Sequence, residues 1–302
     1  MDVVTGAFGY TGRFITRRLL EAGREVRTLT GHPNRADPFG GKVTVAPFSF
    51  DDPAALVASL RGAEVLYNTY WVRFPYRGAN FDQAVRNTTA LLRAAEEAGV
   101  RRVVHISITN PSRASDLPYF RGKALAEDAV MASAMSHAII RPTVLFGEGD
   151  VLINNIAWLA RRLPLFAVPG TGAYHVQPVF VGDVADLAVA TGARHDDCVV
   201  DAAGPETYSF EELVRLVARA VGRRPRIIHL PPTLVLALVK IIDRAVGDIV
   251  LTADELRGLM AGLVASRQTP TGTTRLSDWL RQHADEVGRA YASELARHYR
   301  SG

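Results

Sequence analysis

A tyrosine and a lysine stand four residues apart in the stretch PYFRGK, as Tyr119 and Lys123. The phenol of tyrosine has a pKa of about 10 and is a poor base at neutral pH. An ammonium group one helical turn away lowers that pKa, because it stabilises the phenolate. The pair could therefore pass a proton to or from a substrate oxygen. The alternative is that two helix residues share this spacing by chance.

Lysine is rare in this chain, which makes its presence at position 123 informative. The lysines are Lys42, Lys123 and Lys240, and all other residues in the combined count of lysine and arginine are arginines. Arginine is bulkier and planar, and it cannot act as the same compact donor. The choice of lysine favours a functional pair.

Three glycines form a second group whose spacing suits a function. Gly6, Gly9 and Gly12 lie in TGAFGYTGRF, directly after the apolar stretch DVVT and at the start of a predicted helix over residues 11–23. In this context they allow a tight turn, close approach of backbone amides to a pyrophosphate, and packing of the helix on the strand. The helix N-terminus adds free N–H groups and a positive dipole end. We expect a dinucleotide site here rather than a turn that binds nothing.

These residues must be positioned by the elements around them, which alternate between strand and helix. We predict strands over residues 2–5, 25–30, 42–48, 63–70, 101–108 and 136–142, and helices over 11–23, 52–60, 81–100 and 119–134. Such alternation implies parallel strands joined by right-handed crossovers. The predicted fold is α/β, with a doubly wound parallel Rossmann sheet.

The alternation loosens after Pro142, which suggests a second region. We expect a dinucleotide-binding domain over residues 1–149, completed by 176–203, and a smaller, mostly helical substrate-binding region over 150–175 and 204–302. Helices appended on the C-terminal side of such a sheet usually cover the ligand crevice.

Composition argues against several classes of protein. The net charge is +4, but the arginines and acids alternate without a basic stripe, so a nucleic-acid binder is disfavoured despite a pI near 9.4. Cys198 is the single cysteine, and the histidines lack the His-Glu-x-x-His spacing, so we expect no internal disulfide and no metal site. The first residues lack the pattern of a secretory signal, which predicts a cytoplasmic protein.

The most apolar later segment covers residues 233–242, with 249–251 beyond it. It is too short to span a bilayer and is interrupted by Lys240, so we expect no transmembrane segment. A helix packed into the core is favoured over an anchor on a membrane surface.

Four stretches together give the chain a family resemblance: TGAFGYTG, PYFRGKALAED, RPTVLFG and QPVFVGDVA. The chain resembles the short-chain dehydrogenase/reductase superfamily, and within it the extended and atypical, NAD(P)-dependent epimerase/dehydratase-like members. It is similar to bacterial proteins related to the accessory subunit of respiratory complex I with this fold, and more distantly to NmrA-like proteins. The resemblance covers almost the whole chain. It is specific for fold and nucleotide, and poor for substrate.

The resemblance implies catalytic roles for particular residues. Tyr119 would be the general acid/base toward a carbonyl or hydroxyl, while Lys123 would hold the nicotinamide ribose. The family usually has a small hydroxyl residue where this chain has Ile108. Its neighbours Ser107 and Thr109 share a strand face, and either would orient the substrate oxygen. This departure weakens the case for turnover.

The same resemblance predicts which residues contact the cofactor. They are Gly6, Phe8, Gly9, Tyr10, Gly12, His32, Arg35, Ser49, Phe50, Thr69, Tyr70, Lys123, Pro142 and Val144. Tyr70 and Trp71 either narrow the nicotinamide side of the crevice or pack as aromatic residues beneath helices.

We expect NADP(H) to be preferred over NAD(H). An acid at the end of the second strand would repel a 2′-phosphate, but none occurs there until Asp37. His32 and Arg35 lie in the loop instead, and a guanidinium can bind a phosphate through two hydrogen bonds.

Two classes of function remain, and fold alone cannot separate them. One is an NAD(P)-dependent enzyme. It is either an oxidoreductase that acts on a small carbonyl or alcohol, or an epimerase or dehydratase that acts on a nucleotide sugar. The other is a non-catalytic NAD(P)(H)-binding sensor or assembly protein. Tyr119 and Lys123 favour the first class, and Ile108 favours the second. Relatives often dimerise through helices that would here be 79–98 and 119–134, but packing within one chain explains the same apolar positions equally well.

Overall fold

The computed structural model describes residues 1–33 and 35–298, and the chain divides into two compact units. The first unit comprises Met1–Pro142 and Val181–Ala202, and the second comprises Thr143–Phe180 and residues 203–298. The boundaries differ from those we expected, because β7 (Val144–Phe146) pairs with β10 (Pro178–Phe180) inside the second unit. Residues 299–302, which we assigned to the C-terminal region, lie outside the described residues.

A seven-stranded parallel sheet forms the centre of the first unit. Its strand order is β11-β6-β5-β4-β1-β2-β3. The strands are β1 (Asp2–Thr5), β2 (Val26–Thr30), β3 (Val43–Pro47), β4 (Val65–Asn68), β5 (Arg102–Ile106), β6 (Ser136–Pro142) and β11 (Cys198–Ala202). This sheet confirms the predicted Rossmann fold. The strand order reverses between β1 and β4, and ligands of such sheets bind at the carboxyl ends of the strands there.

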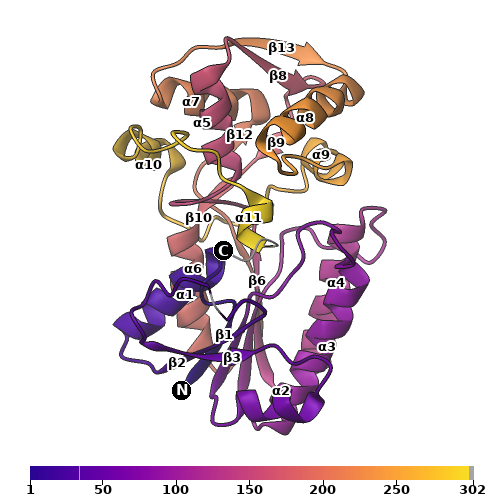
Figure 1. Ribbon diagram of the computed structural model, residues 1–302, viewed down its shortest axis with the longest axis vertical. Coiled ribbons are helices and arrows are strands. Elements are labelled where there is room, and N and C mark those ends of the chain that lie inside the picture. Colours follow the sequence, from indigo (N-terminus) through magenta and orange to yellow (C-terminus); the bar gives the residue numbers. More distant parts are fainter. Residues whose placement is uncertain (34, 299–302) are drawn as a thin grey trace. The chain divides into compact units, whose positions relative to one another are not determined.

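Helices cover both faces of this sheet (Figure 1). On one face lie α2 (Pro53–Leu60), α3 (Phe81–Glu97) and α4 (Pro118–Met131), and on the other lie α1 (Tyr10–Glu21) and α6 (Val181–Gly192). Fully buried residues such as Val3, Leu66, Leu91, Val103 and Ile139 form the core between the sheet and α2, α3 and α4. The helices α1 and α4 each begin beside the carboxyl ends of the strands, which is where the candidate site lies.

The second unit combines helices with three two-stranded sheets. The helices are α5 (Leu152–Arg162), α7 (Phe210–Ala220), α8 (Pro232–Val246), α9 (Ala253–Met260), α10 (Leu276–Gln282) and α11 (Glu294–His298). The sheets are β10-β7, β12-β9 and β13-β8, with β8 (Leu165–Pro169), β9 (His175–Val176), β12 (Tyr208–Ser209) and β13 (Arg226–Leu230). We expected a mostly helical region after Gly204 and predicted no strand there. The strand β13 was missed because Ile227 and Ile228 are adjacent, which hides the two-residue alternation of a strand.

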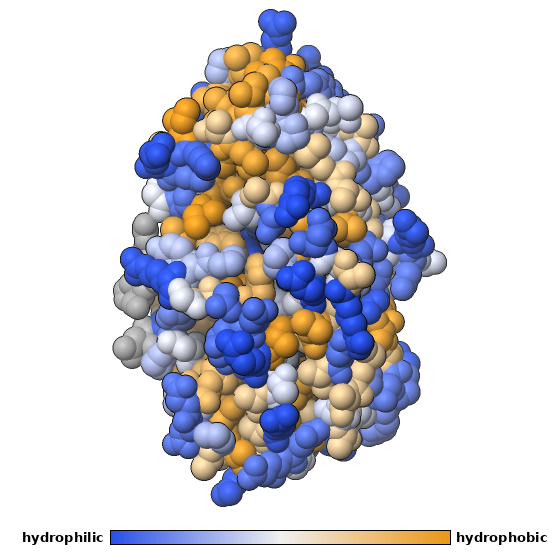
Figure 2. Space-filling model, turned by 90° about the vertical axis from the view of Figure 1, so that its right-hand side faces the viewer, coloured by the Kyte–Doolittle hydropathy of each residue, from blue (hydrophilic) through white to orange (hydrophobic). Residues whose placement is uncertain are grey.

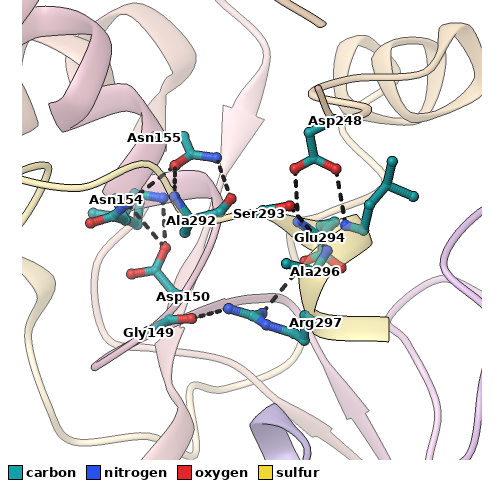
Figure 3. Close-up of polar contacts among 12 residues, drawn as sticks. Gly149, Asp150, Asn154, Asn155, Asp248, Ala292, Ser293, Glu294, Ala296 and Arg297 are labelled. Atoms are coloured by element: carbon teal, nitrogen blue, oxygen red, sulfur yellow. Dashed lines mark hydrogen bonds and ion pairs between the residues drawn. The ribbon is translucent and has the colours of Figure 1, made fainter. Parts of the chain in front are cut away.

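Polar contacts tie the closing segment, residues 287–297, into the second unit (Figure 3). The side chain of Asn155 accepts a hydrogen bond from the backbone N–H of Ala292 at 2.9 Å and donates one to its carbonyl at 3.0 Å. The carboxylate of Asp248 accepts from the backbone N–H groups of Glu294 at 2.8 Å and Leu295 at 2.9 Å. Side chains of distant segments therefore fix the start of α11.

The helix α8 has apolar residues on its outer side. Val235 and Val239 are buried, but Leu234, Leu238 and Ile241 are 52%, 42% and 62% exposed. We expected this segment to pack into the core. That expectation is wrong for the side of the helix that carries Leu234, Leu238 and Ile241, because only the opposite side meets the rest of the unit. Among the described residues, no helix combines the length and apolar character needed to cross a membrane.

Candidate functional site

Glycines shape the loop between β1 and α1. Gly6 has φ of +64°, in the left-handed region that favours glycine. The backbone N–H of Gly9 donates to the carbonyl of Gly6 at 2.8 Å. A Cβ on Gly12 would lie 2.2 Å from that carbonyl oxygen, whereas a Cβ on Gly9 would lie 3.1 Å from it. Position 12 therefore excludes every side chain, while position 9 is only tight.

The N-terminus of α1 can accept an anion. Gly9 is its N-cap and has no side chain, and the first turn carries no acidic residue. The amide groups of this turn and the helix dipole therefore favour a phosphate. Phe8 and Tyr10 are half-buried beside the loop, and the ring of Phe8 lies 6.3 Å from that of Phe39.

A hydrogen-bond network joins the carboxyl ends of β1, β4 and β5. The hydroxyl of Thr5 accepts from the backbone N–H of Thr69 at 2.7 Å. The side-chain oxygen of Asn68 accepts from the backbone N–H of Tyr70 at 3.1 Å, so its amide nitrogen, 3.0 Å from Nδ1 of His105, is the donor in that contact. The ring proton of His105 is then on Nε2. Burial, followed by the charge of a nearby lysine, lowers the pKa of His105 to about 3, so the imidazole is neutral.

Aromatic rings cluster near the end of β3. Phe48 and Phe50 stack with centroids 4.9 Å apart, and each lies 5.4 Å from the ring of Tyr70. The side-chain amide of Asn87 donates to the hydroxyl of Tyr70 at 2.8 Å. Tyr70 thus takes part in aromatic packing, with its hydroxyl bound by a neighbour. Ser49 is half-buried beside this cluster.

Lys123 is buried one turn after Tyr119 on α4, with 3% of its surface exposed. Its Nζ donates to the carbonyl of Ile106 at 2.9 Å and lies 4.5 Å from the centre of the Trp71 ring. Burial lowers the pKa of Lys123 to about 7, although the charge of Glu127 opposes the shift. Near neutral pH, a small change in the surroundings of this amine therefore changes its charge.

Three aromatic rings hold Tyr119 in place. The centroids of Trp71, Phe81 and Phe120 lie 6.1, 5.7 and 5.7 Å from its ring, each in an edge-to-face arrangement. Such contacts fix the ring plane. Trp71 contacts both members of the pair, and the structure accordingly places Tyr119 and Lys123 on one helix and around one indole.

The two hydroxyl residues after β5 have different surroundings. Ser107 is 6% exposed, and within the described residues its hydroxyl has no hydrogen-bond partner. Thr109 is fully buried and donates to the carboxylate of Asp201 at 3.3 Å. Ile108, between them, is half-buried. A buried hydroxyl without a partner costs free energy, so Ser107 is the better candidate to bind a ligand oxygen.

Two further buried polar atoms near Lys123 have no partner in the part of the chain that the structure describes. They are Nε2 of His105 and Nε1 of Trp71. The ribose hydroxyls and carboxamide of a nicotinamide nucleotide could supply partners for such atoms and for the ammonium group. Together with the glycine loop, these residues fit a dinucleotide.

The loop after β2 contains the residues expected at the adenosine 2′ position. The backbone N–H of Arg35 donates to the carbonyl of His32 at 3.2 Å, and both residues are half-buried. The carboxylate of Asp37 accepts from the N–H groups of Phe39 at 2.8 Å and Gly41 at 2.6 Å. The only acid of this loop is thereby engaged in its own turn.

The last two expected cofactor contacts lie in different units. Pro142 ends β6, and its carbonyl accepts from the backbone N–H of Thr109 at 3.0 Å. Val144 lies in β7 of the second unit, where its N–H donates to the carbonyl of Gln177 at 3.3 Å. Their contact with one cofactor stays a prediction.

Sequence reasoning missed Asn68 and His105, which the structure brings together in the centre of the sheet. The available signal was a polar residue directly after an apolar run in each predicted strand, Asn68 after VLY and His105 after VV. Buried polar side chains need partners, so this pattern could have suggested that the two strands are neighbours.

Residues 6–154 match the family model described as NAD(P)H-binding. The chain is 28% identical over 242 residues to subunit 9 of the NADH dehydrogenase (ubiquinone) 1 alpha subcomplex, mitochondrial, of Arabidopsis thaliana. That match covers 76% of the chain and 60% of the plant protein. It is also 28% identical to the (4-alkanoyl-5-oxo-2,5-dihydrofuran-3-yl)methyl phosphate reductase of Streptomyces griseus, over 94% of the chain and 98% of that enzyme.

Two solved structures show the same fold at low identity. The NADPH-dependent quinone oxidoreductase of Escherichia coli, complexed with NADPH, gives a TM-score of 0.74 at 19% identity and covers 93% of this chain and 99% of its own. A nucleoside-diphosphate-sugar epimerase from Staphylococcus aureus gives 0.73 at 16% identity, with 93% and 100% covered. The family model thus assigns an NAD(P)H-binding domain to residues 6–154, and the two solved structures share the fold of the chain.

Proposed function

We propose that the protein is an NAD(P)-dependent oxidoreductase acting on a small carbonyl or alcohol. The observation that carries this proposal is the buried Lys123 one turn after Tyr119, next to a strand end where the hydroxyl of Ser107 has no partner in the described residues. The match to the Streptomyces reductase over nearly the full length of both chains supports an enzyme.

The residues of the chain have separate tasks in this reaction. When bound, the nicotinamide supplies or accepts a hydride. Tyr119 passes a proton to or from the substrate oxygen, and the ammonium of Lys123 stabilises the phenolate that remains. Ser107 donates a hydrogen bond to the same oxygen. The first turn of α1 holds the pyrophosphate.

Tyr119→Phe tests the proposal, because it removes the transferable proton and keeps the ring. Turnover should fall by about 10²–10⁴, the usual size of general acid/base catalysis, while cofactor affinity changes little. The assay follows nicotinamide absorbance against a panel of quinones, aldehydes, ketones and nucleotide sugars. Tyr67→Phe is the matched control, because Tyr67 is buried in β4 against Gly192 of α6 and should lose no activity. Equal turnover by the parent and Tyr119→Phe would remove Tyr119 from the mechanism.

A non-catalytic dinucleotide-binding protein is the second candidate. It is favoured by Ile108 at the position of the usual hydroxyl residue and by the relative that is a complex I subunit. In that case the parent binds NAD(P)H firmly, turns over none of the panel, and Tyr119→Phe changes nothing measurable. Lys123→Arg should weaken cofactor binding in both cases.

A further inference from the structure

The outer side of α8 is a continuous apolar stripe. Leu234, Leu238 and Ile241 are the large side chains in it, and Ala237 and Ala245 are exposed between and beyond them. Spacings of three and four residues place all five on one side of the helix. No polar residue interrupts the stripe, so this side has the character of a surface that is normally covered.

Further exposed apolar side chains lie at the start of the segment that forms β8, the strand that packs beside α8. Leu163, which caps the end of α5, and Leu165, the first residue of β8, are 44% and 47% exposed. We call Leu163, Leu165, Leu234, Leu238 and Ile241 the α8 patch. It holds five of the nine large hydrophobic side chains that are exposed in the described residues. Figure 2 shows apolar surface gathered over the second unit, and a patch, unlike a single exposed leucine, indicates an interaction site.

Positive charges border the α8 patch. Lys240 and Arg244 are exposed along one edge of the stripe. Arg226 begins β13, the partner strand of β8, and follows Arg223 and Arg224; all three are exposed. None of these five cations has an ion pair with a described residue. Their charges are therefore available to an anionic partner.

Arginine charges near the end of α5 affect one another. Burial is the main cause that lowers the pKa of Arg161, and the neighbouring charges of Arg289, Arg223 and Arg162 lower it further, against the opposing charge of Asp285. The last turn of α5, which precedes β8 in the chain, therefore carries clustered arginine charges. An apolar stripe edged by lysine and arginine is the pattern of a helix that lies in the surface of a bilayer, with its cations at the headgroups.

A second copy of the chain fits the patch less well. A symmetric contact through α8 would bring Lys240 and Arg244 of both copies together. The one carboxylate of α8, on Asp243, is half-buried and accepts a hydrogen bond from the backbone N–H of Val250 at 2.8 Å. Asp243 interacts with Lys240 of its own helix, so a symmetric pair of helices would set two such carboxylates against four cations.

We propose that the α8 patch docks on the surface of a bilayer containing anionic phospholipid. The apolar stripe enters the interface, and the flanking cations contact phosphate groups. This inference goes beyond the proposed function, because it uses none of the residues assigned to the dinucleotide site. It concerns where the protein works, so binding to vesicles and binding of cofactor can be measured separately.

The test is flotation of the full chain with vesicles of phosphatidylcholine alone and of an equimolar mixture with phosphatidylglycerol. The parent should float with the anionic vesicles. Leu238→Glu should weaken this binding by about tenfold or more, since an exposed leucine no longer enters the apolar layer. The double variant Lys240→Gln, Arg244→Gln should weaken it by about fivefold per charge removed, and its binding should depend less on salt.

Val199→Glu provides the matched control. Val199 is 40% exposed in β11 of the first unit, against 42% for Leu238, so the two substitutions add a charge at equally exposed apolar sites. The control should float like the parent, and every variant should bind NADPH like the parent.

Three outcomes would overturn the proposal. In the first, the parent binds NADPH but floats with neither vesicle. In the second, Leu238→Glu floats as well as the parent. In the third, Leu238→Glu converts a dimer into a monomer in solution while vesicle binding is absent, which would assign the patch to a second copy of the chain.

Discussion

The two ends of the proposed dinucleotide site are built in different ways. At the phosphate end, the loop from Gly6 to Gly12 presents backbone, and its shape depends on the absence of side chains. At the nicotinamide end, Lys123, Ser107 and His105 present buried polar side chains, some with atoms that have no partner in the described residues. The first end is a matter of steric fit, and the second is a matter of charge and hydrogen bonding. Substitutions at the glycine loop should therefore change stability and binding through steric clashes, whereas substitutions at the other end should change how binding depends on charge and pH.

The largest effect should come from the phosphate end, with Gly12→Ala. The added Cβ would lie 2.2 Å from the carbonyl oxygen of Gly6, a backbone atom that cannot move without opening the loop. We expect loss of about 3 kcal/mol or more from the free energy of unfolding, and NADPH binding too weak to titrate. Gly9→Ala, with a contact of 3.1 Å, should cost about 1 kcal/mol. Thermal unfolding and fluorescence titration of both variants measure the contrast, and equal behaviour would contradict it.

A smaller effect should appear at the nicotinamide end as a dependence on pH. The pKa of Lys123 in the free protein is lowered to about 7. Ribose hydroxyls that accept hydrogen bonds from Nζ favour the ammonium form, so binding raises this pKa and takes up a proton. Affinity should therefore be highest below pH 7 and fall by up to about tenfold per pH unit as the pH rises above it.

Calorimetry at pH 8 in two buffers of different ionisation enthalpy measures this proton uptake directly. Lys123→Met should lose both the uptake and the pH dependence, while Gly9→Ala should keep them. If the parent takes up no proton, Lys123 does not contact the cofactor through its ammonium group.

The smallest effect should be on the choice between NADPH and NADH, which depends on the loop after β2. Arg35 lies half-buried in the loop after β2, and Asp37, the acid of that loop, binds its own backbone. We propose that Arg35 contacts the 2′-phosphate of NADP(H). Arg35→Ala should weaken NADPH binding about tenfold and leave NADH binding unchanged. Lys42→Ala, an exposed cation nearby in sequence, is the control. Tighter binding of NADH than NADPH by the parent would contradict the preference.

The sequence was sufficient to predict the elements of the first unit and the position of the glycine loop. Both depend on local rules: strand and helix periodicity, and the need for glycine where backbone meets backbone. The pair Tyr119 and Lys123 was also predictable, because its members lie on one helix.

Contacts between distant strands could not be predicted in this way. Thr109 donates to Asp201 of β11, a strand whose place beside β6 the sequence alone does not specify. The distinction between Ser107 and Thr109 depends on that contact. For α8, periodicity shows that Leu234, Leu238 and Ile241 share a side, but only the structure shows that nothing in the described chain covers it.

The closing segment has a consequence for how the protein folds during synthesis. A helix as short as α11 is not stable by itself in water, and its first amides are held by Asp248, while Asn155 of α5 binds Ala292. The helix α5 leaves the ribosome long before its partner Ala292 is made. The second unit can therefore complete these hydrogen bonds only after residue 295 has emerged, whereas the strands of the first unit are all available once residue 202 has emerged.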